Sequence, residues 1–428
     1  MSSPPGQLQR RSSLDSRRSF RDKAGMTYKL LIVTFTLFIE ENMSKIKIIA
    51  LLTIFLDILG FTIMIPAMPG LANDYHVAYT MITLWSALYA LFGIFSTPML
   101  GGRSDKIGRK PVMLISMIGS MLAYFSIAIS HNIWMYILGM VINGITAGNI
   151  GTAQSILSDI AKDKKERMTN LGLFGMIFGV GFIIGPVIGA LTLKFGNHGP
   201  FRTAGVLALI NITSAALFLK ETHTKREEHS HIKLNIYNIF KDIVVGKERV
   251  YYLIYFLINL GIMIYQSTYL LYLDKSFAIP GSSWGFIMGA YGLMMILNQG
   301  LLFKKVWLKL PTKTLLYISF IGFITCYLGA FFFPFKRAVI ILVGITTLFQ
   351  WIFRPVFQNI ILGENKNVGL INGNMLNLMN IANIFGPLIG GALLDSSISP
   401  FALSALAIAA AFVVYTKITE HRSHSIGH

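Results

Sequence analysis

Charged residues are scarce in this chain. Only 13% of its 428 residues are Asp, Glu, Lys or Arg, whereas about a quarter are charged in a soluble domain. Cysteine is nearly absent too: Cys326 is the single one, so no intrachain disulfide can form, and we interpret it as a small buried hydrophobe. The sequence has no phosphate-binding loop, no serine-nucleophile motif and no cluster of His, Cys and acidic residues. These absences exclude direct ATP drive and argue against an enzyme, a metal site or a cofactor.

Long apolar segments fill most of the chain instead. Each of twelve such segments is about as long as the roughly 20 residues that a helix needs to cross a bilayer. We therefore predict an all-α polytopic membrane protein with twelve transmembrane helices. The predicted spans are 48–69, 80–100, 111–130, 133–157, 169–193, 203–219, 250–273, 284–303, 314–334, 338–361, 370–394 and 401–417.

Lys and Arg are distributed unevenly between the predicted loops. Of the 37, 31 lie on one side of the membrane and five on the other, and Arg354 lies inside a span. Such a bias marks the cytoplasmic side, so we expect both termini in the cytoplasm. The net charge of +18 then reflects topology and contact with anionic lipid, not a nucleic-acid partner.

The two halves of the chain resemble each other. IIGPVIGALTL at 183–193 matches IFGPLIGGALL at 384–394, and FLDILG at 55–60 matches FLINLG at 256–261, both at an offset of 201 residues. Two matches at one offset predict two six-helix repeats, the plan of many secondary transporters. Asp57 of the first repeat corresponds to Ile258 of the second, so its carboxylate is an addition to the shared scaffold.

The predicted domains follow from this plan. They are a cytoplasmic tail (1–46), a first six-helix bundle (47–219), a cytoplasmic linker (220–249), a second bundle (250–417) and a cytoplasmic tail (418–428). Met43 begins MSKIKIIALL, which reads as a natural start, so we expect residues 1–42 to be dispensable. His229 and His231 have no third ligand at a defined spacing, and we interpret them as part of a solvated linker.

A charged motif, GGRSDKIGRKPVML at 101–114, lies between the second and third predicted helices. Its glycines let the chain turn closely, and Asp105 can meet a helix dipole or nearby basic residues. The motif resembles the signature of the major facilitator superfamily, with matches at Gly101, Asp105, Lys106, Gly108, Arg109 and Lys110. The resemblance implies that Asp105 and Arg109 form a cytoplasmic charge latch that favours the outward-facing state, with Asp159 as acidic partner.

Two further segments narrow the resemblance. LDILGFTIMIPAMPGL at 56–71 resembles the first helix of the tetracycline–proton antiporters, and FGVGFIIGPVIGAL in the fifth helix is similar to the drug–proton antiporter motif. The small residues of that motif permit close helix packing, and its proline favours a bend. The residues of the helix-five motif are Gly181, Gly185, Pro186 and Gly189.

Three positions depart from the family pattern. Met140 stands where the fourth helix of the drug–proton antiporters carries an arginine, and Ala123 and Phe323 stand approximately where the tetracycline exporters carry membrane acids. These departures keep a second interpretation open: a facilitator or uptake carrier for a small metabolite, uncoupled or differently coupled. A transporter-derived receptor without turnover is disfavoured, because the loop motif and the Gly/Pro-rich helices serve conformational cycling.

Away from the span ends, the predicted spans contain two full charges, Asp57 and Arg354. An unpaired charge in the membrane costs at least ~2.5 kcal/mol and usually marks a functional site. The resemblance places helices one, four, seven and ten around a central cavity. We predict that the two residues pair in one conformation and that a proton or substrate on Asp57 breaks the pair. The alternatives are a static pair, a carboxylate satisfied by Thr53 and Thr62, or two residues that never meet.

Amide and aromatic side chains are expected to line the cavity, which suits a bulky amphiphile. The candidates are Asn143, Gln154, Asn259, Tyr265, Gln266, Gln299, Gln350, Trp351 and Gln358. The expected protein is a monomeric secondary transporter of the cell membrane. We expect it to export small amphipathic organic molecules by alternating access, with protons as the coupling ion.

Overall fold

Helices form almost the whole described part of the chain. The computed structural model describes residues 45–222, 243–246, 248–298, 302, 306–362 and 368–426. No strand occurs in these ranges. The chain divides into two compact units, residues 1–48 and residues 49–428, and the second unit contains nearly all of both predicted bundles.

Eleven described helical segments are long and apolar enough to cross a membrane. The 17-residue α12 (Gly281–Leu297) occupies the place of the expected eighth span. The all-helical polytopic prediction is thus confirmed, and the count of twelve holds to within this one segment.

The first half contains α2 (Lys45–Ile63), η1 (Ile65–Ala67), α3 (Met68–Asp74), α4 (Tyr79–Ile107), α5 (Arg109–Ala128), α6 (Ile133–Ile145), α7 (Asn149–Asp159), α8 (Lys164–Thr192), η2 (Leu193–Phe195) and α9 (Gly199–Phe218). The second half contains α11 (Arg249–Phe277), α12, η4 (Trp307–Lys309), α14 (Thr312–Phe332), α15 (Lys336–Leu362), α16 (Val368–Asp395) and α17 (Pro400–Ile426).

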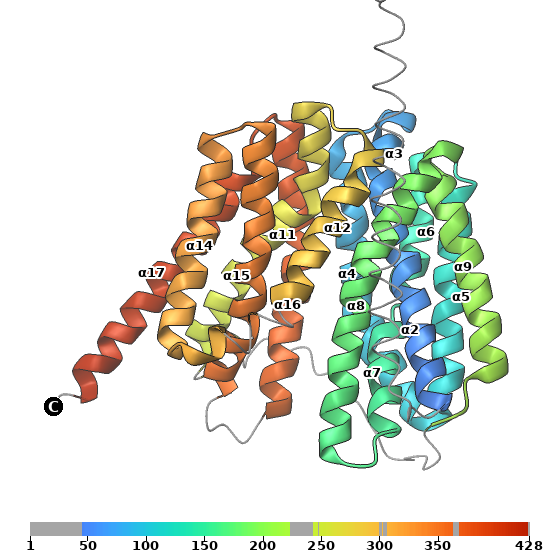
Figure 1. Cartoon of the computed structure of the whole chain (residues 1–428), viewed down its shortest axis with the longest axis horizontal. Coiled ribbons are helices and arrows are strands. Elements are labelled where there is room, and N and C mark those ends of the chain that lie inside the picture. The colour runs from blue at the N-terminus through green and yellow to red at the C-terminus, as the bar shows by residue number, and fades with distance from the viewer. Residues whose placement is uncertain are drawn as a thin grey trace, which may run out of the picture. The chain divides into compact units, whose positions relative to one another are not determined.

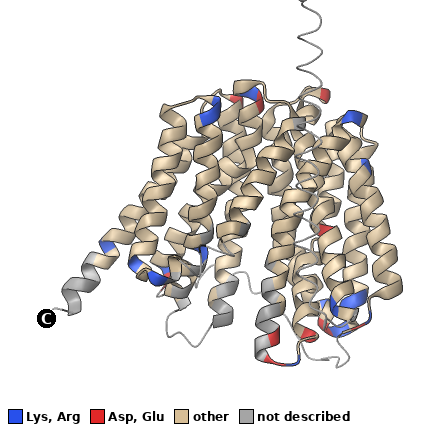
Figure 2. Cartoon of the chain, viewed as in Figure 1, with Lys and Arg blue, Asp and Glu red and all other residues tan. Residues whose placement is uncertain are grey.

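The surface of the helices matches a lipid environment. Most charged residues in Figure 2 gather near the helix ends, with a belt of largely uncharged residues between them. Large apolar side chains remain exposed along the belt, including Leu122 at 51% and Leu406 at 64%. Lipid tails cover such side chains without cost, so the fold depends on close packing between helices rather than on hiding apolar surface from water.

The packing repeats at the same offset as the sequence. A Cβ added at Gly189 of α8 would overlap the carbonyl oxygen of Ile63 in α2. A Cβ added at Gly390 of α16 would lie 2.6 Å from the carbonyl oxygen of Ile264 in α11. Gly189 and Gly390 are 201 residues apart in the sequence, and so are Ile63 and Ile264. Each half therefore packs its fifth helix on its first through a glycine that permits backbone contact.

Two helix pairs join the halves: α4 lies beside α16, and α8 beside α12 (Figure 1). A Cβ added at Gly391 of α16 would lie 2.7 Å from Thr80 Cα in α4, and one at Gly285 of α12 would lie 2.5 Å from the Pro186 carbonyl in α8. We call the end of the bundle that holds residues 79–80 and Asp395 the upper end. The opposite end, which holds residues 105–110, is the lower end.

Candidate functional site: the Asp57 network and the Arg109 cluster

Asp57 lies inside the first span, and its carboxylate contacts the fourth. The side-chain amide of Asn149 donates from Nδ2 to Asp57 Oδ1 over 2.8 Å. Asn149 is the first residue of α7 and is buried, whereas Asp57 on α2 is partly buried. The carboxylate therefore has a neutral partner that supplies one hydrogen bond to its ionised form.

A break in the fourth span positions this amide. α6 ends at Ile145 and α7 begins at Asn149. Within the break, the Thr146 hydroxyl donates to the Ile142 carbonyl over 2.9 Å, and the Gly148 amide donates to the Thr146 carbonyl over 2.7 Å. Because the break interrupts the regular helical phase, the direction of Asn149 cannot be extrapolated from α6. Sequence reasoning named Asn143 and Gln154 in this span but missed Asn149.

Asn149 extends the contact into a polar network within the first half. Its Nδ2 also lies 3.4 Å from Ser120 Oγ on α5, and Ser120 donates to Asn143 Oδ1 over 3.0 Å. Asn143, a predicted cavity residue, is buried within this network. Asn149 Oδ1 has no hydrogen-bond partner among the described residues. The Asn149 side chain thus donates from Nδ2 to Asp57, while its Oδ1 could still accept a hydrogen bond.

The structure does not bring Asp57 and Arg354 together. Arg354 on α15 is exposed, and its Nη2 lies 3.3 Å from Met379 Sδ on α16. The ion pairs found in the described ranges do not include Asp57. Thr62 does not satisfy the carboxylate either, because its hydroxyl donates to the carbonyls of Ile58 and Gly181 at 2.9 and 3.0 Å. Pairing of Asp57 with Arg354 stays a prediction for another conformation.

Aromatic side chains lie one helical turn from Asp57. Phe61 has ring-centroid distances of 5.7 Å to Trp85 and 6.1 Å to Tyr89, both on α4. All three are partly buried, and Trp85 Nε1 has no hydrogen-bond partner among the described residues. Sequence reasoning missed this group; the available signal was the i, i+4 spacing of Phe61 from Asp57, and of Trp85 from Tyr89.

The other predicted cavity residues have varied surroundings. Tyr265 is buried against Tyr327, with ring centroids 4.8 Å apart, and its hydroxyl lies 3.4 Å from Thr346 Oγ1. Asn259 donates to the Tyr255 carbonyl on its own helix over 2.7 Å. Gln154 and Gln266 are exposed, Gln350 and Gln358 are partly buried, and Gln299 and the side chain of Trp351 lie outside the described part of the chain. Lining of a common cavity by this set stays a prediction.

The three departures from the family pattern are packing positions. Met140, Ala123 and Phe323 each have 0% exposure. Phe323 stacks on Tyr327 with ring centroids 6.0 Å apart. The sites where the resemblance places ionisable side chains are therefore filled by close-packed apolar groups in this chain.

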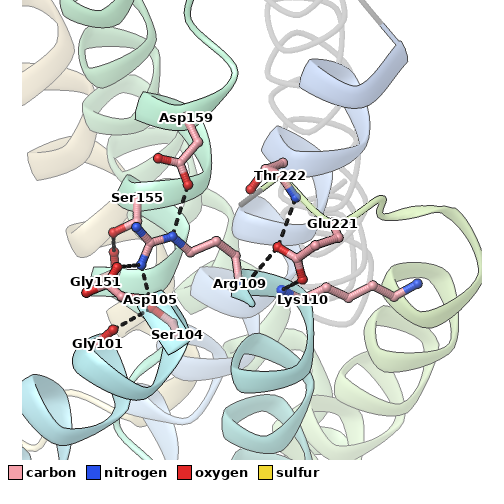
Figure 3. Close-up of polar contacts among 10 residues, drawn as sticks. All are labelled: Gly101, Ser104, Asp105, Arg109, Lys110, Gly151, Ser155, Asp159, Glu221 and Thr222. Atoms are coloured by element: carbon pink, nitrogen blue, oxygen red, sulfur yellow. Dashed lines mark hydrogen bonds and ion pairs between the residues drawn. The ribbon is translucent and has the colours of Figure 1, made fainter. Parts of the chain in front are cut away.

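The Arg109 side chain binds two carboxylates and one hydroxyl group at the lower end (Figure 3). Its Nη1 lies 2.6 Å from Asp105 Oδ1 and 2.5 Å from Ser104 Oγ, while its Nε lies 2.9 Å from Asp159 Oδ2 on α7. The Arg109 side chain is only 10% exposed. The structure thus brings together the three residues assigned to the charge latch; its role in gating stays a prediction.

Glu221 completes this cluster from the end of the first half (Figure 3). Its carboxylate accepts the backbone amides of Arg109 at 2.8 Å and Lys110 at 3.1 Å. These are orphan donors at the start of α5, where a negative charge is favourable. Gly108, with φ of 108°, allows the approach, because a Cβ there would overlap the carboxylate. Sequence reasoning missed Glu221, although KETH directly follows the sixth predicted span.

The helix-five motif packs α8 against α2. Cβ atoms added at Gly181 and Gly185 would meet Ile58 and Thr62. Gly189 occupies the next turn of the same face, while Pro186 presents its carbonyl to α12. The motif therefore acts through backbone proximity on two faces, one within the first half and one toward the second.

These features define a class: a polytopic carrier built from two packed helical repeats, with one carboxylate inside the membrane. Residues 50–364 match the model of the Major Facilitator Superfamily. The chain belongs to this superfamily. It is a transporter rather than an enzyme.

Curated relatives agree with this assignment. The chain is 30% identical to the class H tetracycline resistance protein of Pasteurella multocida over 362 residues, covering 81% of this chain and 88% of that one. It is 25% identical to multidrug resistance protein 2 of Bacillus subtilis (strain 168), covering 84% and 91%. Resistance to tetracycline and to multiple drugs is thus the property named among its relatives.

Solved structures support the fold alone. The human organic anion transporter MFSD10 (TETRAN) has a TM-score of 0.65 at 18% identity, with 86% of this chain and 98% of that chain covered. The nucleoside transporter NupG has a TM-score of 0.69 at 14% identity, with 88% and 98% covered.

Proposed function

We propose that this protein exports small amphipathic organic molecules by proton-coupled alternating access, as a monomer in the cell membrane. The observation that carries the proposal is the Asp57 carboxylate, held inside the membrane by the neutral Asn149 amide at 2.8 Å. A carboxylate at that depth is costly when ionised and unpaired. Proton uptake or binding of a cationic group therefore changes the free energy of the site.

Asn149 suits both protonation states of Asp57. An asparagine side chain has donors on its nitrogen and acceptors on its oxygen. The Nδ2 donor holds the ionised carboxylate, and the partnerless Oδ1 can accept from the protonated acid after the side chains rotate. Binding of proton and substrate can then compete at Asp57, and each can favour a different conformation by its differential affinity.

The orientation follows from the charge bias. Most Lys and Arg residues fall in the loops on the side of the 101–114 motif, so we place the lower end and both termini in the cytoplasm. The upper end, where α4 meets α16 and α8 meets α12, then faces away from the cytoplasm. We interpret this conformation as closed at the upper end. The Arg109 cluster, whose residues all belong to the first half, lies at the cytoplasmic end.

The substrate class rests on two supports. Relatives of this chain are named tetracycline and multidrug resistance proteins. Phe61, Trp85 and Tyr89 form an aromatic group one turn from Asp57, and Trp85 keeps an unused donor. Aromatic surfaces with few polar groups bind bulky amphiphiles with modest specificity.

A facilitator or uptake carrier is the second candidate. The specific observation that favours it is Met140, which fills with 0% exposure the position where the resemblance places an arginine. Without that cation, movement of substrate along its own gradient needs no proton exchange.

Proton release distinguishes the two candidates. Purified protein in weakly buffered detergent solution is mixed with tetracycline or tetraphenylphosphonium, and the released protons are measured with an indicator dye, with binding followed calorimetrically. We expect release from the wild type, none from Asp57→Asn, and release from the control Asp74→Asn, whose carboxylate accepts from Asn197 at the upper end. Equal release from wild type and Asp57→Asn removes Asp57 from coupling. Binding without release from the wild type would favour the facilitator.

A further inference from the structure

Asp395, the last residue of α16, binds the start of a helix in the opposite half. Its Oδ1 accepts the Tyr79 amide over 2.8 Å, and its Oδ2 accepts the Thr80 amide over 3.0 Å and the Thr80 hydroxyl. Tyr79 is the first residue of α4, and the partners are separated by more than 300 positions in sequence. The carboxylate of the second half thus satisfies two orphan amides of the first half.

α4 has no cap of its own. The residue before it is Ala78, in an extended conformation and without a side-chain hydrogen bond. Helices prefer Ser, Thr, Asp or Asn at this position because their side chains accept the first free amides. In this chain that acceptor comes from Asp395, and its negative charge also matches the positive end of the α4 dipole.

Neighbouring contacts hold Asp395 in place. Lys275 of α11 donates to the carbonyl of Leu394 and lies 3.2 Å from Ser397 Oγ, and its Nζ is 5.9 Å from the ring centroid of Tyr79. The backbones approach closely at Gly391, where a Cβ would lie 2.7 Å from Thr80 Cα. The cap can therefore form only while α4 and α16 are together at the upper end.

We infer that Asp395 is a second latch, separate from the charge latch at Arg109, and that it holds the upper end closed. Opening of the upper end therefore uncaps α4. This inference rests on the proposed alternating access. Each time the halves separate at the upper end, the amides of Tyr79 and Thr80 exchange Asp395 for water. Loss of the latch should shift the population toward the upper-end-open state about ten-fold, the size expected for loss of a helix cap.

A labelling experiment measures this shift directly. Replacing the single cysteine, Cys326→Ser, gives a background free of thiols. Thr83→Cys then reports opening, because Thr83 is 3% exposed beneath the contact with Gly391. The labelling rate with a polar maleimide should rise about ten-fold in Asp395→Ala. It should rise less in Asp395→Asn, which keeps one acceptor oxygen. The control Asp74→Ala should leave the rate unchanged, since Asp74 contacts Asn197 within the first half.

The outcomes separate this inference from the export proposal. An unchanged rate in a monodisperse Asp395→Ala protein overturns the latch, and so does an equal rise in Asp395→Ala and Asp74→Ala, which would report general loosening of the upper end. A ten-fold rise in protein that shows no transport in vesicles would leave the latch in place while the export proposal fails.

Discussion

The two halves share their backbone packing but not their polar groups. Gly189 meets Ile63 in the first half as Gly390 meets Ile264 in the second, each pair displaced by 201 residues. Yet Asp57 corresponds to Ile258, which has 0% exposure. Close helix contact is thus the property that both repeats keep, while the membrane carboxylate belongs to one half alone.

The second half has an interior of tyrosines. Tyr265 lies against Tyr327, and the Tyr269 hydroxyl bonds to that of Tyr291, which in turn donates to the Ile340 carbonyl over 2.7 Å. Neutral hydroxyl groups keep their hydrogen bonds without an ionisable carboxylate. Under the proposed function, the first half carries the proton-binding carboxylate, whereas the second half contributes paired tyrosine side chains.

We expect the largest effect from replacing Asp57 with the residue that the second half has at the equivalent position. Asp57→Ile copies the second repeat into the first. Because the proton-binding group is lost, accumulation of substrate against its gradient in energised vesicles should disappear. Exchange of substrate without a proton gradient should persist. Retained accumulation in Asp57→Ile would contradict the assignment of coupling to the first half.

The reverse change tests the same comparison from the other side. Ile258→Asp buries a carboxylate at a fully buried position of α11. We expect its free energy of unfolding to fall by about 3 kcal/mol, the cost of a charge near the centre of a membrane helix. Chemical denaturation in detergent measures this loss. Full stability with restored coupling in the Asp57→Ile background would instead show that the halves are interchangeable.

The next effect concerns the packing that the halves share. Gly189→Ala and Gly390→Ala each place a methyl group against a backbone carbonyl of the facing helix. We expect each to lower the free energy of unfolding by about 2 kcal/mol, since the helices must move apart. The control is Gly93→Ala, whose Cβ would have its nearest neighbour at 4.0 Å, and it should be neutral or slightly stabilising. A large loss of stability from only one of the two variants would show that the two halves do not depend equally on this helix contact.

The sequence alone predicts the spans and the repeat, because run length and a fixed offset are local or periodic signals. It does not predict Asn149, because the break at residues 146–148 changes the helical phase. It misses Asp395 for another reason: the missing cap before α4 is visible at Ala78, but the residue that replaces it lies in the other half. Contacts set by tertiary docking leave no periodic trace.

A smaller effect is expected at the lower end, where the halves differ again. The offset of 201 places Val306, Leu310 and Ile360 at the positions of Asp105, Arg109 and Asp159, so these three charges have no charged counterpart at that offset. Arg109→Gln removes the cation that Asp105 and Asp159 share. We expect a loss of about 1.5 kcal/mol, less than for a fully buried pair, because these carboxylate side chains are 32% and 23% exposed.

Glu221→Gln is the matched variant for this cluster. It keeps an acceptor oxygen for the α5 amides but removes the charge, so its loss should stay below about 1 kcal/mol. Thermal unfolding of both variants in the same detergent measures the difference. Equal losses would mean that the charge of Glu221 at the start of α5 stabilises the lower end as much as the ion pairs of Arg109 do.

The smallest effect is expected at His198, which lies in the loop before α9 at the upper end. Its Nε2 lies 3.2 Å from the Tyr75 hydroxyl and 3.4 Å from Ser130 Oγ. Burial lowers the pKa of His198 below its usual 6.5, and the charge of Arg202 acts in the same direction, while Asp74 opposes it. The offset places Ser399, which cannot titrate, at the same position of the second half.

The sign of the pH effect follows from that lowered pKa. Below pH 6.5 the unfolded chain binds a proton at this histidine more readily than the folded one, so stability falls as the pH drops. Because His198 is only partly buried, solvent screening keeps the change under about 1 kcal/mol. Unfolding temperatures measured between pH 8 and pH 5 should therefore decline less in His198→Gln than in the wild type. Parallel declines would show that the acid sensitivity of the upper end arises from groups other than His198.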